Sequence, residues 1–453
     1  MDHQAILKGV AELRRIPRDQ HPISRRDISK AALKVLYQLG DAGYEAFLVG
    51  GGVRDLLLGK HPKDFDVATD ATPEEVRQLF RSSRIVGRRF KIVHIRFGRE
   101  IIEVTTFRAP HGPDAEPAEE LSKHEFQQKS SVQSSNGMLL RDNVYGSVDE
   151  DALRRDFTVN SLYYTVDGFE LWDFCSGLED LEARQIRVIG DPEARYKEDP
   201  VRMLRAIRFA AKLDFEIAKD SAKPINKHAH LLQSVSGARL FDETLKMFSS
   251  GYGAKTYEIL RQFEIGEYLI PLTLEAVEEG DANAARLVEL ALQNTDQRLQ
   301  EEKSVTPAFL FAALLWPALR MQLGPQNFSA LSIFDIQSAA NQVFREQLDF
   351  TAIPKRFCIA AREIWELQLR LQRKNRRSID AAMRHPRFRA AFDFLLLREE
   401  SGEDLDGLGQ WWTQYQFGDT NQQADMVNAA SPPQNTKKRR RRRRKKPATS
   451  NNS

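Results

Sequence analysis

Hydrophobic positions in the first part of the chain form short runs that glycine and acidic residues interrupt. Tyr44–Val49 is an apolar run that ends at three consecutive glycines, and the residues after the glycines have helical spacing. Further along, period-two alternation predicts strands. We therefore expect a mixed strand and helix region over residues 29–192, with a helix at Val53–Leu58 and strands at Phe65–Thr69, Ile92–Phe97, Ile101–Phe107, Tyr163–Val166 and Phe169–Trp172.

The pattern changes at about residue 193, where apolar residues begin to recur at helical spacing. Helical patterns dominate from that point on. The chain is thus predicted to be an α+β protein whose second part is helical, with helices at Val201–Leu213, Ala238–Phe248, Tyr257–Phe263, Ala284–Gln293, Pro307–Leu319, Phe357–Leu371 and Phe388–Leu397.

Three segments lack such patterning. Residues 1–28 form a polar lead-in, and residues 110–143, rich in Glu, Ser, Gln and Lys, predict a mobile insertion. Residues 418–453 lose apolar content and are predicted to be a disordered tail. The tail carries ten consecutive cations at Lys437–Lys446, and removing them from the net charge of +3 leaves −7 for residues 1–436. This basic run indicates attraction to RNA phosphates or, as the alternative, a solubilising terminus.

Composition narrows the class of protein. With 453 residues and 41% hydrophobic content, the chain can bury a large core in two to four domains. Its two cysteines, Cys175 and Cys358, lie far apart and form no metal-binding spacing, which suits a reducing compartment. The first residues do not resemble a signal peptide, and no apolar run reaches membrane-helix length. These features predict a cytoplasmic protein without a membrane span.

Asp64 and Asp66 follow the glycine turn and carry the most informative chemistry. Alternate side chains of a strand share a face, so both carboxylates would point one way while Phe65 and Val67 enter a core. Such a pair suits two divalent cations held about 3.5–4 Å apart. The free backbone N–H groups at the start of the helix after the glycine turn suit a phosphate. A phosphate cradle beside a metal platform predicts nucleotidyl transfer.

The glycine turn, its Arg54-Asp55 pair and the Asp-x-Asp sequence together resemble the class II nucleotidyltransferases, which are CCA-adding enzymes and bacterial poly(A) polymerases. Two further segments match this family, namely RRDFTVN at residues 154–160 and EDPVRMLR at residues 198–205. The segment Val86–His94, which contains Arg88, Arg89 and Phe90, is similar to the strand that marks bacterial poly(A) polymerase I. The resemblance covers roughly residues 20–420.

Helix geometry independently indicates that the EDPVRMLR segment could recognise a nucleotide base. Asp199 and Arg202 are three residues apart and would share one face of a helix. A carboxylate accepts and a guanidinium donates, which matches the amine and ring nitrogen of adenine and cytosine and rejects guanine and uracil. Pocket size must then separate adenine from cytosine, and the bulky Arg88–Phe90 segment is a candidate wall.

The resemblance implies a five-stranded antiparallel catalytic head at residues 29–192, a helical neck for base recognition at 193–260 and a helical, RNA-binding body at 261–417. It also implies a monomer that adds AMP from ATP to the 3′ ends of mRNA and other transcripts, without a template, as a step toward RNA turnover with RNA-decay proteins. The implied site comprises Asp64 and Asp66 for two Mg²⁺, Asp156 as a further carboxylate, Gly51, Arg54 and Arg154 for the triphosphate, and Asp199 and Arg202 for the base, with Arg205 nearby.

Two other functions stay open. A CCA-adding tRNA nucleotidyltransferase shares every catalytic motif, although the Arg88–Phe90 segment, the insertion and the basic tail favour the polymerase. A non-catalytic RNA-binding protein would use the helical body and the tail, but the intact pair Asp64 and Asp66 argues against it.

Overall fold

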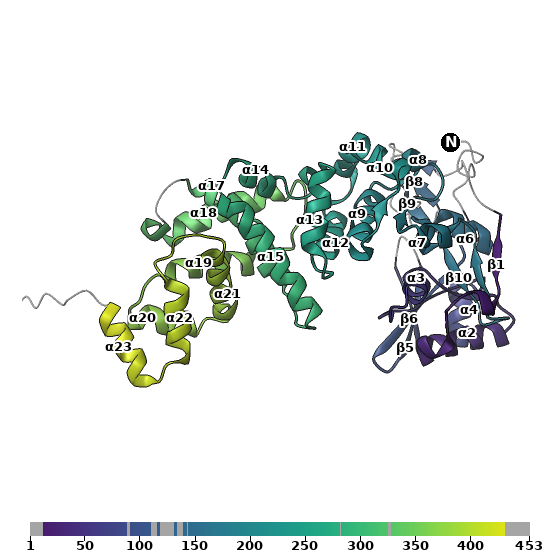
Figure 1. Cartoon of the computed structure of the whole chain (residues 1–453), viewed down its shortest axis with the longest axis horizontal. Helices are drawn as coiled ribbons and strands as arrows, with labels where there is room; N and C mark the ends of the chain where they lie inside the picture. The colour runs from purple at the N-terminus through teal and green to yellow at the C-terminus, as the bar shows by residue number, and fades with distance from the viewer. Residues whose placement is uncertain are drawn as a thin grey trace, which may run out of the picture.

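The computed structural model describes residues 12–87, 91–109, 116–117, 131–133, 139–142, 144–280, 282–324 and 328–430. The molecule is elongated, with a sheet-containing head at one end and helices along the rest of its length (Figure 1). The predicted α+β class and the order of head before helices are confirmed. Arg88–Phe90 and the basic run Lys437–Lys446 lie outside the described residues, so the predictions for them stay predictions.

The head is built on an eight-stranded sheet in the order β1-β11-β10-β2-β3-β6-β5-β4. It is larger than the five antiparallel strands expected, and β3 pairs with β6 in parallel. The pair is parallel because the connection through α4 (Pro73–Leu79) makes β4 run in the direction of β3, and the two reversals at β4–β5 and β5–β6 then restore that direction in β6. The strands are β1 (Arg14–Ile16), β2 (Ala46–Val49), β3 (Asp66–Thr69), β4 (Ser83–Val86), β5 (Ile92–Phe97), β6 (Glu100–Thr106), β10 (Leu162–Tyr164) and β11 (Leu171–Asp173).

The first described residues belong to the head, so the prediction of a separate polar lead-in is wrong for them. β1 pairs with β11 at the edge of the sheet, and Ile16 and Ile23 are buried. His21 Nε2 lies 2.9 Å from the carbonyl oxygen of Phe169 in the β10–β11 hairpin. Isolated apolar residues between polar ones gave too weak a pattern to predict this edge strand.

Two apolar clusters cover the two faces of the head sheet. On one face, α2 (Lys30–Asp41) packs Val35 and Leu36 against Val67 of β3. On the other face, Phe47 and Tyr163 pack with Ala68. Both faces of the central strands are therefore buried, with successive residues on opposite faces. Between residues 110 and 143, where a mobile insertion was predicted, a separate three-stranded sheet forms from β7 (Glu116–Pro117), β8 (Ser131–Gln133) and β9 (Leu139–Asp142).

Helices make up nearly all of the described chain after the head. The predicted helix Val201–Leu213 is α9 with those bounds, whereas the predicted Pro307–Leu319 is two helices separated at Leu315, just before Pro317. The pattern missed α14, α18, α20 and α22. The longer helices are α9, α12 (Gly237–Phe248), α13 (Gly253–Gln262), α14 (Pro271–Glu279), α15 (Ala282–Gln300), α16 (Pro307–Leu314), α17 (Trp316–Leu323), α18 (Ile333–Gln347), α19 (Lys355–Leu371), α20 (Arg376–Met383), α21 (Phe388–Glu400) and α22 (Leu408–Phe417).

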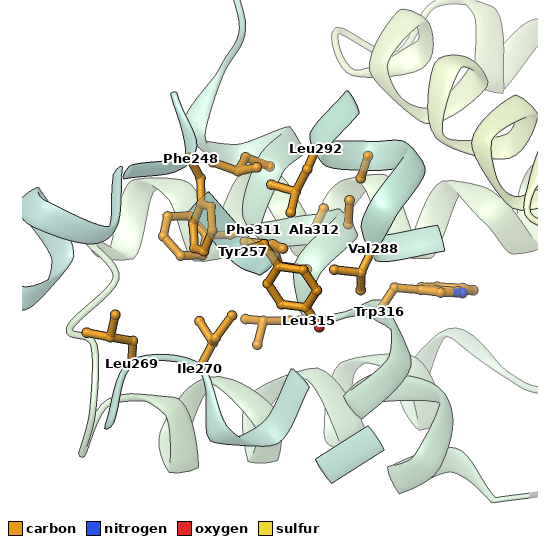
Figure 2. Close-up of a cluster of buried hydrophobic side chains, with 14 of the residues drawn as sticks. Phe248, Tyr257, Leu269, Ile270, Val288, Leu292, Phe311, Ala312, Leu315 and Trp316 are labelled. Atoms are coloured by element: carbon orange, nitrogen blue, oxygen red, sulfur yellow. The ribbon is translucent and has the colours of Figure 1, made fainter. Parts of the chain in front are cut away.

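A single apolar core joins these helices. Its buried residues run from Phe157 to Tyr415, and Figure 2 shows the part where Tyr257 and Leu292 meet Phe311. The prediction that the tail is disordered from residue 418 is wrong for residues 420–430, which form α23 (Thr420–Ala430). α23 buries none of its own residues fully, which explains why hydrophobic patterning did not reveal it.

Both cysteines are free, as expected from their spacing. Among the described residues, no helix combines the length and the apolar character that crossing a membrane requires.

Candidate active site

The glycine turn lies against Asp66. Gly50 has a φ of 68° and precedes α3 (Gly51–Leu57), which starts two residues earlier than predicted. A Cβ added at Gly50 would lie 3.8 Å from Asp66 Oδ2 and 3.5 Å from Arg155 Nη1. This left-handed conformation favours glycine because other residues carry a strained Cβ there. The turn thus brings backbone N–H groups, a carboxylate and a guanidinium to one place.

Asp64 and Asp66 lie where the strand pattern predicted, with one difference. Phe65 and Val67 are buried and Asp66 is partly buried, but Asp64 is exposed and precedes β3 instead of belonging to it. The two carboxylates are close enough for the charge of Asp64 to raise the pKa of Asp66. The structure therefore brings together the two residues predicted to hold metal.

A third carboxylate, Glu103, joins them from β6. The parallel register places Glu103 directly opposite Asp66. Burial, followed by the charges of Glu103 and Asp64, raises the pKa of Asp66 to about 6 against the opposing charge of Arg155. The sequence signal was only that Glu103 is the polar residue between two buried ones, Ile102 and Val104, because strand order cannot be read from alternation.

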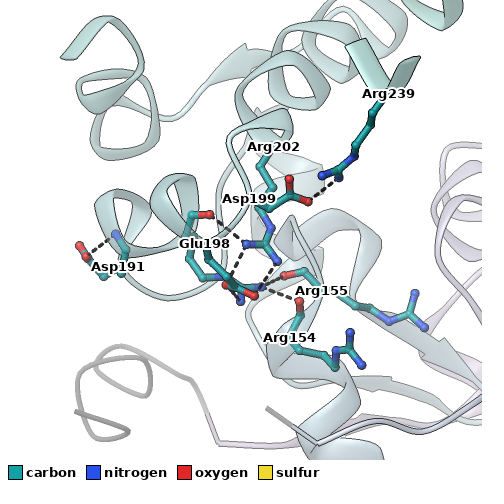
Figure 3. A network of polar contacts seen from close by, with 9 residues as sticks. Arg154, Arg155, Asp191, Glu198, Asp199, Arg202 and Arg239 are labelled. Atoms are coloured by element: carbon teal, nitrogen blue, oxygen red, sulfur yellow. Dashed lines mark hydrogen bonds and ion pairs between the residues drawn. The ribbon is translucent and has the colours of Figure 1, made fainter. Parts of the chain in front are cut away.

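Arg155 is the guanidinium that reaches the turn. Its Nε donates to the Tyr163 hydroxyl at 2.6 Å, and its Nη2 donates to Asp151 at 3.1 Å. These contacts fix the side chain over the sheet face that carries Asp66. Of the two arginines in this motif only Arg154 was predicted to contact the triphosphate; Figure 3 shows the side chains of both pointing away from Glu198.

Asp156 faces the neck instead of the other carboxylates. Its Oδ2 accepts from Arg205 Nε at 2.7 Å, and its Oδ1 accepts from Asn160 Nδ2 at 3.2 Å. Burial alone would raise the pKa of Asp156, but Arg205, Asn160 and Arg202 together lower it to about 2. Asp156 is therefore a charged residue already paired with cations, across the boundary between head and neck.

Arg54 extends this network into the head. Its Nη1 donates to Asn160 Oδ1 at 2.6 Å, and its Nε and Nη2 donate to Asp55 Oδ1 at 2.9 and 2.7 Å. The guanidinium also lies 5.3 Å from the ring of Phe209 on α9. Arg54 is only 1% exposed. Its guanidinium, which lies beside Gly51, is thus committed to protein groups, and the predicted contact of Gly51 and Arg54 with the triphosphate stays a prediction.

Asp199 and Arg202 do not share a helix, so that part of the prediction is wrong. Asp199 ends α8 (Pro192–Glu198) with an extended backbone, and α9 begins only after Pro200. Arg202 pairs with Glu198 at 2.8 Å, while Asp199 accepts from Arg239 of α12 at 2.7 Å. The two side chains still come from one junction, since the Arg202 N–H donates to the Asp199 carbonyl.

Arg195 ties this junction to the head. Its Nη1 donates to Glu198 at 2.7 Å, and its Nη2 donates to the carbonyl oxygens of Arg154 and Arg155. Burial and the nearby Arg202 lower the pKa of Arg195 to about 10. Sequence analysis missed Arg195, Glu198 and Arg239 because their roles depend on how α8, α9 and α12 meet.

The site therefore has two parts with opposite electrostatics. Acidic groups crowd together beside the glycine turn, and arginines dominate the junction of head and neck. No group of three or more His, Cys, Asp or Glu side chains in the described residues is arranged to hold a metal ion. Carboxylate oxygens nevertheless suit hard cations such as Mg²⁺, and at Asp66 burial and the like charges of Glu103 and Asp64 outweigh the charge of Arg155 and raise the pKa.

Comparison with known proteins gives three family matches along the chain. A family described as "Poly A polymerase head domain" matches residues 46–187. One described as "Probable RNA and SrmB-binding site of polymerase A" matches residues 214–276, and one described as "Polymerase A arginine-rich C-terminus" matches residues 331–446. Their order along the chain follows the order of head and helices.

The chain is 50% identical over 418 residues to poly(A) polymerase I of Salmonella typhimurium, which covers 91% of this chain and 88% of that protein. It is 36% identical over 241 residues to the CCA-adding enzyme of Lactobacillus helveticus, covering 53% of this chain and 55% of that enzyme. The crystal structure of the Bacillus stearothermophilus CCA-adding enzyme with CTP has a TM-score of 0.55 and 24% identity, over 84% of this chain and 80% of that one. The last likeness supports the fold alone.

Proposed function

The chain belongs to the poly(A) polymerase I family, and we propose that it adds AMP from ATP to RNA 3′ ends without a template and releases pyrophosphate. The relatives support an adenylyltransferase that acts on RNA. The finer features, namely a two-metal mechanism, a cytoplasmic role in RNA turnover and work alongside RNA-decay proteins, are part of this proposal. The observation that carries it is the crowding of carboxylates around Asp66 beneath the Gly50 turn.

Asp64 and Asp66 are the residues that would hold two Mg²⁺ ions, with Glu103 close to Asp66. When bound, such ions supply Lewis-acid polarisation of the reacting oxygens and neutralise the leaving group. Asp66 fits this role because burial and like charges disfavour its ionised form in the protein by itself. Asp64, being exposed, stays open to solvent and to an incoming nucleotide.

The triphosphate would lie against the glycine turn. Gly50 and Gly51 offer N–H groups without a side chain to block a phosphate, and Arg155 Nη1 lies next to that position. Arg154 is the second guanidinium of the motif. We propose that Arg54 acts indirectly, by holding the turn through Asp55 and Asn160, because its burial leaves little surface for contact.

Base selection would use the junction between α8 and α9. The Glu198 and Arg195 contacts of Arg202 use three of its five N–H groups, which leaves Nε and one Nη2 hydrogen for a base edge. Asp199, held by Arg239, would accept from the exocyclic amine of adenine. A base with the reverse order would leave buried polar groups unpaired. Asp156 and Arg205 would keep this junction docked on the head.

The test is nucleotide addition by the purified protein with an unstructured RNA and with a tRNA that lacks its 3′ end. Each labelled nucleotide is supplied alone, with Mg²⁺ or with a chelator. We expect long AMP tracts on the unstructured RNA, dependent on Mg²⁺. Addition of two C and one A to the tRNA alone would instead establish the CCA-adding alternative, and RNA binding without any addition would establish a non-catalytic binder.

A further inference from the structure

A second polar pocket lies on the head, away from the candidate active site. It has a volume of about 490 Å³ and is lined by Arg18, Ser24, Arg25, Arg26, Tyr164 and Phe169. The N-terminal segment contributes four of these residues, and the β10–β11 hairpin contributes the other two. The pocket is thus formed by the part of the chain whose sequence pattern indicated only a polar lead-in.

The sheet separates this pocket from Asp66. Neighbouring residues of a strand point to opposite faces, and Tyr163 packs with Ala68 on one face while Tyr164 packs with Val67 on the other. Asp66 shares the face of Ala68, because the two are alternate residues of β3. A molecule in the pocket therefore would not touch the candidate metal ligands.

The Tyr164 hydroxyl at this pocket is a hydrogen-bonding group without a partner in the described residues. The side chain of Tyr164 is fully buried. Most buried hydroxyls are paired, because leaving one unpaired loses the hydrogen bonds that water would make. Arg18 and Arg25 are near enough to oppose the rise that burial imposes on the pKa of this hydroxyl. The hydroxyl therefore lies close to both guanidinium groups, in the lining of the same pocket.

The charges around the pocket favour an anion. Three arginines line it, and none of its lining residues is acidic. Arg18 Nη1 donates to the His21 carbonyl at 3.1 Å, and Arg25 Nη1 donates to the Tyr37 hydroxyl at 3.0 Å. Each of these contacts occupies one N–H group of a guanidinium that has five. The Arg25 guanidinium also lies 4.6 Å from the ring of Phe169, which orients its plane.

We propose that this pocket binds a backbone phosphate of the RNA substrate, upstream of the 3′ end. Guanidinium groups and a hydroxyl donor form the usual recognition set for a phosphate oxygen. Arg18, Arg25 and Arg26 are exposed, so a continuous strand has access to them. The proposal rests on RNA being the substrate, and it adds a contact that lies outside the reacting centre.

The experiment compares RNA affinity against salt concentration for three variants, measured by fluorescence anisotropy in a chelator so that no turnover occurs. Arg18→Gln with Arg26→Gln removes two cations from the pocket, and Tyr164→Phe removes only the buried hydroxyl. The control is Arg77→Gln with Arg81→Gln, which removes two exposed cations of the head, one on α4 and one in the turn after it. Thermal unfolding of each variant checks the fold.

We expect the double pocket variant to bind RNA about fivefold more weakly at low salt and to lose about 0.7 from the log–log salt slope, as one neutralised phosphate predicts. Tyr164→Phe should bind RNA more weakly without melting at a lower temperature, since its hydroxyl has no partner in the protein. A merely structural tyrosine would lose thermal stability instead. The control should keep both affinity and slope.

Equal affinities and slopes in wild type and both pocket variants would overturn the proposal, as would an equal loss in the control. A raised KM for ATP at saturating RNA, with RNA affinity unchanged, would assign the pocket to the nucleotide and also reject it. Because binding is measured without turnover, an inactive wild-type protein would count against the proposed function and leave this result standing.

Discussion

Asp66 and Asp156 are both partly buried aspartates of the head, yet their surroundings change the carboxyl pKa in opposite directions. Burial and the neighbouring Glu103 and Asp64 raise the pKa of Asp66 to about 6. Asp156 is as well shielded from water, but Arg205, Asn160 and Arg202 lower its pKa to about 2. At Asp66 burial and like charges outweigh the one guanidinium nearby, that of Arg155, whereas at Asp156 the paired groups of the protein outweigh burial.

This difference in pKa separates two roles, binding a metal ion and forming an ion pair within the protein, which a motif match alone does not distinguish. A carboxylate among like charges is suited to an ion that arrives with the substrate, since that ion relieves the repulsion. A carboxylate with an arginine partner contributes to stability and orientation, since the pair is satisfied before any substrate binds. On this basis we propose that Asp66 takes part in the chemistry and that Asp156 stabilises the joint between head and neck.

The largest expected effect is the loss of nucleotide addition in the Asp66→Asn variant. Nucleotide addition should fall by about three orders of magnitude or more, because a site that depends on shared carboxylates fails as a unit. Steady-state addition of labelled AMP measures it, with Asp167→Asn, an exposed acid in the β10–β11 turn, as the control. Activity within about tenfold of the wild type would remove Asp66 from the metal site.

Next in size is Arg202→Ala, which tests whether the arginine-rich junction reads the base. We expect kcat/KM for ATP to fall by about 100-fold, with discrimination against GTP and UTP relaxed, since the truncation leaves Glu198 without this partner and removes two N–H donors. Competition between nucleotides at saturating RNA gives the ratio. If selectivity is unchanged while stability falls, Arg202 is only a structural link.

Replacing the two aspartates by asparagine should change the free energy of unfolding in opposite directions. Asp156→Asn should lose about 2 kcal/mol at pH 7, because its lowered pKa reflects favourable pairing in the folded state. Asp66→Asn should gain stability in a chelator, because its raised pKa reflects an unfavourable charge. Urea unfolding of both variants without metal measures this. Losses of similar size in both would show that the two environments are alike.

The smallest effect is a difference in pH dependence. A carboxylate with a lowered pKa contributes stability above about pH 4, its unfolded value, that is lost as pH falls toward 2. A carboxylate with a raised pKa lowers stability as pH rises from about 4 to 6. Relative to wild type, Asp156→Asn should therefore recover at acid pH, and Asp66→Asn should gain most above pH 6. Parallel stability curves would contradict both assignments.

Local rules predicted the parts of the site that depend on neighbours in sequence. Alternation correctly placed Phe65 and Val67 in the core, and helical spacing gave α9 its observed bounds. The break between α8 and α9 was also readable, because a residue before proline avoids helical geometry and Asp199 precedes Pro200. Pro200 therefore argues against one helix that holds both Asp199 and Arg202.

Parts that depend on long-range pairing could not be predicted this way. Glu103 meets Asp66 only because β6 returns beside β3 in parallel, and alternation within one strand carries no information about its neighbour. In the same way, Arg239 reaches Asp199 from 40 residues away through the packing of α12 on the neck. These partners become visible only in three dimensions.

The apolar core that runs from Phe157 to Tyr415 has a consequence for how the molecule melts. Neck and body share this core, which also includes Phe157 and Val188 of the head, so they should unfold in a calorimeter as one cooperative unit together with this part of the head. The sheet of the head, which has its own two clusters, should form a second unit. A proteolytic fragment that ends near residue 260 would leave Tyr257 without Leu292 and Phe311, and we expect it to aggregate. The boundaries between the family matches in the helical part are thus divisions of sequence only, and we expect no separate heat-capacity peak for each matched segment.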